Sequence, residues 1–126
     1  MARDAVQPEG LAVPNAPYSP VVVSGESVYT AGQIANDADG NLVPGGIREQ
    51  TRQALQNVRT CLEAVGCSME DVVKVNAYLV DLGDFAGYNE VYVEFFEAPY
   101  PARASVQAGL PAGVLVEIEA VARRAS

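Results

Sequence analysis

Three charged residues near the end of the chain, Arg103, Glu117 and Glu119, are of types that could act together on a small substrate. A guanidinium group can bind a carboxylate through two parallel hydrogen bonds. A nearby glutamate can orient or deprotonate a water molecule. The three residues are therefore candidates for a site that anchors a carboxylate and activates water beside it, provided that the fold brings them together.

The strands expected to carry these residues, about 102–108 and 115–122, are joined by a short loop centred near Pro111. Side chains alternate between the two faces of a strand, so every second residue shares a face. If the two strands pair antiparallel as a hairpin, Arg103 lies opposite Glu119 on one face of the sheet.

The same pairing places Ser105 opposite Glu117, and a single polar cluster then forms on that face. A second interpretation is a cross-strand salt bridge on a wet surface, worth well under ~1 kcal/mol. Geometry alone favours the salt bridge, and the pattern by itself does not choose between it and a functional site.

The composition excludes several kinds of chemistry. The chain has no histidine, which rules out a histidine general base, a Ser-His-Asp triad and the usual catalytic zinc sites. Its two cysteines, Cys61 and Cys67, are too few for a disulfide scaffold or a Cys-rich metal site, and we expect small core or surface residues. With 8 basic and 16 acidic residues, a net charge of -8 also disfavours binding to nucleic acid.

The same sequence gives no sign of secretion or of membrane insertion. The N-terminus is polar and acidic rather than that of a signal peptide, and no apolar run approaches the ~20 residues that span a bilayer. We therefore expect a reduced, cytoplasmic setting and no membrane partner.

Hydrophobic periodicity predicts one α+β domain over residues 1–126, with an extended lead-in over 1–15. The expected elements, in the order β-β-α-β-α-β-β, are two short strands within 20–35, a helix over 47–66, a strand over 72–81, a helix capped by Asp84, and the two strands described above. An aromatic stripe on the second helix (Phe85, Tyr88, Tyr92, Phe95 and Phe96) is expected to pack in the core.

Two helices can cover only one face of such a sheet. The other face carries too many apolar residues to be left bare to water, so the sequence also predicts self-association.

Beyond these patterns, the chain resembles the RidA (YjgF) family of enamine/imine deaminases. Six segments carry the resemblance, in order and over nearly the whole chain: APYSP (16–20), VYTAGQIA (28–35), QTRQALQNVRTCLEAVG (50–66), VVKVNAYLVDLGDFAGYNEVYVEFF (72–96), YPARASV (100–106) and LPAGVLVEIEAVA (110–122).

The resemblance implies a chorismate-mutase-like fold with two helices on one face of the sheet. It also implies a homotrimer whose three ligand clefts lie between subunits. The activity that it implies is hydrolysis of 2-aminoacrylate and related enamines or imines to 2-keto acids and ammonia, without a cofactor and without a metal.

Residue by residue, Arg103 matches the family arginine that holds the substrate carboxylate, and Glu117 matches the glutamate near the water. Tyr18 matches the tyrosine that walls the cleft, and Asn89 matches a polar cleft residue on the second helix. Gly32 lies where the family brings its backbone close to the ligand, an approach that a residue without Cβ permits.

The chain departs from the family pattern at Ala31, where many members have serine, and at Ser105, where many have cysteine. At Ser105 we expect the backbone N–H to contact the ligand, so this change matters less. The lost hydroxyl at Ala31 leaves substrate choice and turnover open. Pro20 replaces a common glutamine, and Glu119 is expected to be a structural partner.

Besides a purely structural role, which would leave Arg103 unexplained, two other functions remain to be weighed against the deaminase. One is a non-catalytic binder of small 2-keto acids, which Arg103 would serve equally well but in which Glu117 would have little use. The other is an endoribonuclease or translation inhibitor, which the charge of -8 and the absence of histidine disfavour.

Overall fold

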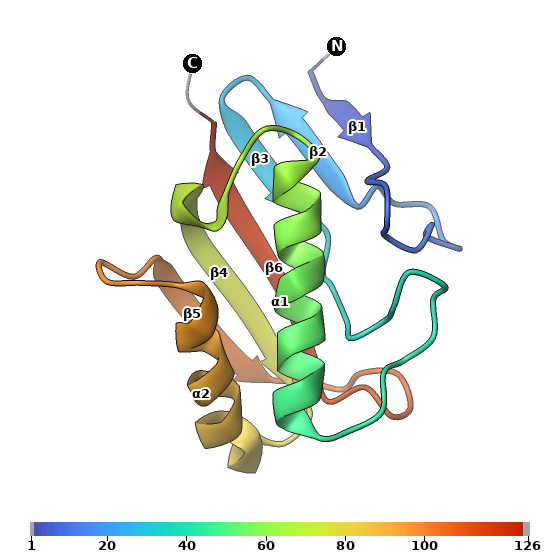
Figure 1. The fold of residues 1–126 in the computed structure, drawn as a ribbon, viewed down its shortest axis with the longest axis vertical. Helices are drawn as coiled ribbons and strands as arrows, with labels where there is room; N and C mark the ends of the chain where they lie inside the picture. Colours follow the sequence, from blue (N-terminus) through green and yellow to red (C-terminus); the bar gives the residue numbers. More distant parts are fainter. Residues whose placement is uncertain (1, 125–126) are drawn as a thin grey trace.

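The computed structural model describes residues 2–124, so Met1 and the last two residues of the predicted domain lie outside the described residues. Two helices lie on one face of a six-stranded sheet (Figure 1). The strands are β1 (Asp4–Val6), β2 (Val21–Ser24), β3 (Ser27–Thr30), β4 (Val72–Leu79), β5 (Ala102–Gln107) and β6 (Val116–Arg123); the helices are α1 (Ile47–Glu63) and α2 (Phe85–Phe95), with 3-10 turns η1 (Met69–Asp71) and η2 (Leu82–Asp84).

The sheet has the strand order β1-β2-β3-β6-β4-β5, so the α+β class predicted from the sequence is confirmed. All neighbours pair antiparallel except β4 and β5, which run parallel with α2 between them in sequence. Parallel neighbours need a crossover connection, and α2 supplies it.

The last two strands do not form the predicted hairpin. β4 lies between them, and its Val75 is paired with Arg103 of β5 on one side and with Ala120 of β6 on the other. The expected pairs of Arg103 with Glu119 and of Ser105 with Glu117 are therefore wrong. The short loop favours a hairpin, whereas β4, buried beneath the helices, needs a strand along each edge to pair its backbone N–H and C=O groups.

Helix α1 packs against the sheet through the side predicted from its periodicity. Its fully buried residues include Ala54, Leu55, Val58 and Leu62. Glu49 begins the helix by accepting a hydrogen bond from the Gly46 N–H at 2.8 Å. The helix ends at Glu63, three residues before the predicted boundary.

A buried glutamine on the same helix also fixes a loop. Gln50 is 2% exposed; its Nε2 donates to the Gly113 carbonyl at 2.8 Å, and its Oε1 accepts from the Leu115 N–H at 2.8 Å. The connection from β5 to β6 is thus attached to α1 at two points.

The aromatic stripe of α2 is buried as predicted at Tyr88, Tyr92 and Phe96. Neighbouring rings contact one another, with centroids 5.8 Å apart between Tyr88 and Tyr92. The predicted side-chain cap by Asp84 is absent: the Asp81 carboxylate instead accepts from the Gly83 N–H at 2.8 Å, because η2 inserts one tight turn before the helix.

Strand β1 is an addition to the predicted elements. It forms within the expected lead-in and pairs antiparallel with β2, so that Ala5 lies beside Val22. Its three residues contain no strong strand signal, and the pairing depends on the exposed edge that β2 offers.

The face of the sheet away from the helices is open and partly apolar. Tyr29 is 47% exposed and Val106 is 48% exposed on this face, beside the half-buried Val22 and Val121. The prediction of an uncovered sheet face is therefore confirmed within residues 2–124.

Candidate functional site

Arg103 lies on the helix-covered face of β5, because it is paired with the inward-facing Val75 of β4. Its Nη1 donates to Oδ1 of Asn89 on α2 at 2.8 Å. No carboxylate among the described residues forms an ion pair with Arg103, so the surface salt bridge considered from the sequence is absent. A half-buried cation with only a neutral partner is suited to accept an anionic ligand.

Three rings of α2 surround the guanidinium group. The Arg103 Cζ lies 4.6 Å from the ring centroid of Tyr92, 5.2 Å from that of Tyr88 and 5.5 Å from that of Phe85. Cation–π attraction at such distances is worth about 0.5–2 kcal/mol per contact and fixes the orientation of the group. The predicted core stripe therefore has a second role, as a support for Arg103.

Ser105 lies two residues further along the same face of β5. Its Oγ is 3.3 Å from the Tyr88 hydroxyl, so the side chain is engaged with α2. β5 is an edge strand of the sheet, and an edge strand leaves alternate backbone N–H groups without a strand partner.

Arg103 and Asn89 line a hollow of about 370 Å³ with four other residues, which are Tyr92, Val93, Tyr100 and Pro101. The walls are mostly apolar, so the guanidinium is the charged group of this hollow. A small carboxylic acid with an apolar side chain matches these surroundings.

Glu117 lies on the opposite, open face of the sheet, where it is paired with Tyr78 of β4. It is packed against Gly32: a Cβ on Gly32 would lie only 2.3 Å from Glu117 Oε2. A side chain at position 32 would therefore force the carboxylate to move. The close approach that the structure shows at Gly32 is to Glu117, and the approach to a ligand stays a prediction.

Burial raises the pKa of Glu117, and the neighbouring charge of Glu119 raises it further. Glu119 itself accepts a hydrogen bond from the Tyr78 hydroxyl at 2.6 Å, and this bond raises the pKa of Tyr78. No described side chain or backbone group donates a hydrogen bond to Glu117. Its carboxylate is thus a basic group whose hydrogen-bond acceptor positions are unfilled among the described residues.

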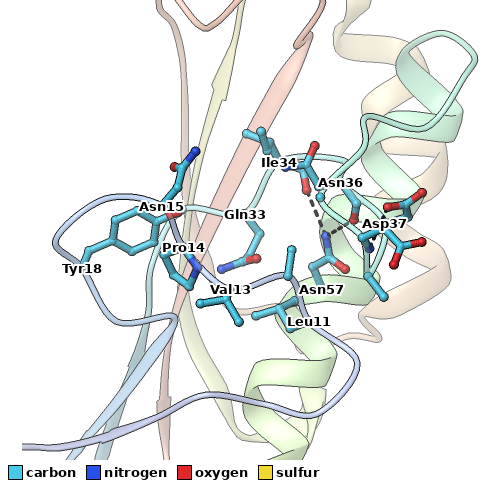
Figure 2. A pocket seen from close by; sticks show the side chains of 15 residues that line it. Leu11, Val13, Pro14, Asn15, Tyr18, Gln33, Ile34, Asn36, Asp37 and Asn57 are labelled. Atoms are coloured by element: carbon cyan, nitrogen blue, oxygen red, sulfur yellow. Dashed lines mark hydrogen bonds between the residues drawn. The ribbon is translucent and has the colours of Figure 1, made fainter.

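Tyr18 and Gly32 line a second hollow of about 350 Å³, between the N-terminal segment and the loop that follows β3 (Figure 2). Figure 2 shows the Tyr18 ring at one side of this hollow and the Gln33 side chain near its middle. Tyr18 is 55% exposed and therefore accessible. Ala31 precedes Gly32, and its N–H donates to the Pro20 carbonyl at 2.8 Å.

The seven predicted site residues therefore fall into two groups. One contains Asn89, Arg103 and Ser105 on the helix side of the sheet; the other contains Tyr18, Ala31, Gly32 and Glu117 near the open side and the N-terminal segment. A single chain does not bring the two groups together, so the single polar cluster predicted from the hairpin is wrong.

The sequence did not assign the contribution of Phe85, Tyr88 and Tyr92 to the site. Their helical spacing resembles that of any buried stripe, and only their contact with Arg103 distinguishes them. Asn89, which follows Tyr88 directly, was the available signal that this side of the helix also carries polar function.

The described residues contain no group of three or more His, Cys, Asp or Glu side chains placed to hold a metal ion. Between residues 2 and 124, neither helix has the length and apolar character needed to cross a membrane.

Comparison with known proteins places this architecture in a family. Residues 10–124 match the family described as Endoribonuclease L-PSP. A RutC family protein of Pyrococcus horikoshii is 45% identical over 122 residues, covering 95% of this chain and 97% of its own. The human protein named 2-iminobutanoate/2-iminopropanoate deaminase is 45% identical over 108 residues, covering 84% of this chain and 79% of its own.

Among solved structures, RidA from an Antarctic Psychrobacter species superposes with a TM-score of 0.90 and 40% sequence identity, covering 95% of this chain and 98% of that one. The chain belongs to the Endoribonuclease L-PSP family, also known as the RidA (YjgF) family, and has its chorismate-mutase-like fold.

The Tyr92 hydroxyl allows a test of the packing of the aromatic rings around Arg103. It is buried without a hydrogen-bond partner among the described residues, and burial raises the pKa of Tyr92 to about 12. Tyr92→Phe keeps the ring and removes an unsatisfied group, so the free energy of unfolding should stay unchanged or rise by about 1–3 kcal/mol.

Tyr88→Phe is the matched control, because it removes a hydroxyl that contacts Ser105. It should lower the free energy of unfolding by about 0.5–1.5 kcal/mol, measured by denaturant titration at one protein concentration. An equal loss in both variants would mean that Tyr92 has a partner in the assembled protein.

Proposed function

We propose that the protein hydrolyses reactive 2-imino acids, and the enamines that tautomerise to them, to 2-keto acids and ammonia. The observation that carries this proposal is Arg103, a guanidinium held by Asn89 and three rings with no acidic partner among the described residues. The human relative that shares 45% identity is named for this chemistry, which supports the assignment.

We further propose that the working site is formed between copies of the chain in a homotrimer, with residues 1–126 acting as one domain. Arg103 and Glu117 point from opposite faces of one sheet and cannot meet on one substrate within a chain. Each of the two groups of site residues, the one with Arg103 and the one with Glu117, would then be a half-site. A neighbouring copy that covers the open apolar face would bring one of its half-sites toward the other half-site of the first copy. Three clefts per trimer follow from this arrangement.

In such a cleft, Arg103 binds the substrate carboxylate through its N–H fork, and Glu117 accepts a proton from water as the water oxygen bonds to C2 of the iminium group. This step gives a tetrahedral carbinolamine. Protonated Glu117 then returns the proton to the amino nitrogen, the C2–N bond breaks with its electron pair on nitrogen, and the hydroxyl proton leaves with ammonia as ammonium. The products from the iminium group and water are therefore a 2-keto acid and ammonium.

The raised pKa of Glu117 suits both halves of this cycle. A carboxylate with a raised pKa is a stronger base, and its acid form persists closer to neutral pH, where it can protonate the leaving nitrogen. The substrate imine is itself the electrophile, so the proposed reaction needs no cofactor.

The remaining predicted residues would shape the cleft. Tyr18 is accessible to form a wall, and Gly32 lets its backbone pack on Glu117. Ser105 would contribute its backbone N–H, since its hydroxyl is close to Tyr88. Ala31 offers only a methyl group, because its N–H is bonded to the Pro20 carbonyl.

Ala31 is also the observation that favours a second candidate, a non-catalytic binder of 2-keto acids. Without a hydroxyl at this position, one polar contact to water or substrate is missing. In a non-catalytic binder Glu117 would have no role, because a carboxylate near an anionic ligand weakens binding. Nuclease activity is less well supported, since the chain has a net charge of -8 and no histidine.

The proposed assembly predicts a mass of three times the 13.3 kDa chain in solution. The physical reason is the apolar open face, which a second copy would remove from water. Light scattering or sedimentation at micromolar concentration measures this directly, and a monomer under these conditions would contradict both the trimer and the shared cleft.

Arg103→Ala should reduce imine hydrolysis by about a hundredfold or more, since a desolvated charged anchor contributes several kcal/mol to transition-state binding. Arg103→Lys should fail as well, because an ammonium group lacks the planar fork. The assay generates imines with an amino-acid oxidase and follows their disappearance by semicarbazide trapping.

Arg52→Ala is the control for Arg103, since Arg52 forms only an exposed ion pair with Glu94 at 2.8 Å. Its activity should match that of the wild type. Wild-type activity in Arg103→Ala would remove Arg103 from the site, and loss of folding in that variant would make its role structural.

Glu117→Gln separates the enzyme from the binder. Turnover should fall by roughly a hundredfold or more, the range for a lost general base. Affinity for pyruvate or 2-oxobutyrate, measured by calorimetry, should hold or rise, because a negative charge near the ligand is removed. Unchanged turnover would exclude Glu117 as the base.

The same variant has an expected effect on stability. Because folding raises the pKa of Glu117, its ionised form costs stability above the ordinary glutamate pKa, and this cost is relieved as the pH falls. Glu117→Gln should therefore be at least as stable as the wild type at neutral pH, by thermal unfolding.

A further inference from the structure

A buried asparagine on α1 holds the loop that follows β3. Asn57 is 7% exposed, and its Nδ2 donates to two carbonyls, that of Ile34 at 3.0 Å and that of Asn36 at 2.9 Å (Figure 2). Its Oδ1 accepts from Gln53 Nε2 at 2.9 Å. Both amide protons of Asn57 are therefore committed to this loop, and its orientation is fixed by a neighbour on the same helix.

The held loop is continuous with the residue that packs on Glu117. Two residues before Ile34 lies Gly32, whose backbone leaves no room for a Cβ beside the carboxylate. Between them, the Gln33 N–H donates to the Ile118 carbonyl at 2.7 Å, and the Ile118 N–H donates back to the Gln33 carbonyl at 2.9 Å. The loop is thus attached to β6 at Gln33 and to α1 at Ile34 and Asn36.

These attachments have different consequences. The bonds at Gln33 fix the loop along β6 and could persist while the loop tilts away from the sheet. The bonds from Asn57 act from α1, on the other side of the loop, and oppose this tilt. Loss of the Asn57 bonds would let Gly32 move off the carboxylate and increase the exposure of Glu117 to water.

From this arrangement we propose that Asn57 is a positioning residue for Glu117: it touches neither substrate nor reacting atoms, and it holds Gly32 against the carboxylate through the Ile34 and Asn36 carbonyls. The kinetic part of the test rests on the deaminase function proposed above. The structural readout, the titration of Glu117, is independent of that function.

The environment of Glu117 makes the consequence measurable. Burial is the first cause of the raised pKa of Glu117, and Gly32 contributes to that burial. The titratable groups facing Glu117 from adjoining positions are Glu119 on β6 and Tyr78 on β4, while segment 31–36 carries none. Release of the loop therefore changes the hydration of Glu117 without changing the charges around it.

The test is Asn57→Ala in the full chain, with Val58→Ala as the matched control. Val58 is the next residue of α1, is fully buried and makes no side-chain hydrogen bond to the loop. Both variants lose stability, but only Asn57→Ala should lower the pKa of Glu117 toward that of an ordinary glutamate, followed by NMR of the side-chain carboxyl carbon.

In the imine assay, the acidic limb of the pH profile should move to lower pH in Asn57→Ala, and kcat should fall by about tenfold or more because the base is less well placed. Affinity for pyruvate should stay near the wild-type value, since Arg103 belongs to the other half-site. Val58→Ala should retain the wild-type pH profile.

An unshifted titration of Glu117 in Asn57→Ala, or an equal shift in Val58→Ala, would overturn the proposal. If Asn57→Ala does not fold, Asn57→Ser retains one donor, and a smaller shift in the same direction is expected; no shift there would also overturn it. If the wild type proves inactive on imines, the deaminase proposal fails while the titration still decides the role of Asn57.

Discussion

The position of β4 between β5 and β6 is the constraint on which the rest of the molecule depends. Because Val75 of β4 is paired with Arg103 on one side and Ala120 on the other, the sheet alternation sends Arg103 toward the helices and Glu117 toward the open face. The two charges of opposite sign cannot neutralise each other within the chain. Each is left without an ionic partner among the described residues, the first supported by aromatic rings and the second packed on a glycine.

The energetic character of the two half-sites also differs. Around Arg103, ring faces and the Asn89 amide orient the cation without cancelling its charge, which leaves its attraction for an anion intact. Around Glu117, removal of water makes ionisation less favourable, and the carboxyl group becomes more basic. The fold therefore keeps both groups in states that a surface salt bridge would abolish.

Local patterns predicted much of this fold, and long-range pairing limited the rest. The periodicity of α1 and the stripe of α2 identified both helices and their buried sides, because these signals lie within a few residues of one another. The partners of β5 could not be derived from its loop to β6, because both strands pair with β4, a buried strand much earlier in the chain whose backbone needs partners along both edges. Residue type and family resemblance predicted which residues form the site. Their separation onto two faces of the sheet could be seen only once the strand order was known. The contacts of Asn57 and Gln50 left no sequence signal beyond polar residues on a helix.

Helix α1 binds two loops through polar side chains, Gln50 at Gly113 and Leu115, and Asn57 at Ile34 and Asn36. These residues lie seven positions apart, two turns along the same side of the helix, so the loops share one rigid support. Neither loop can be released by a motion of α1 without disturbing the other. In hydrogen exchange, the two loops should consequently behave as one cooperative unit with α1. The Leu115 amide should report the opening of that unit, because it is bonded to the Gln50 side chain rather than to a strand.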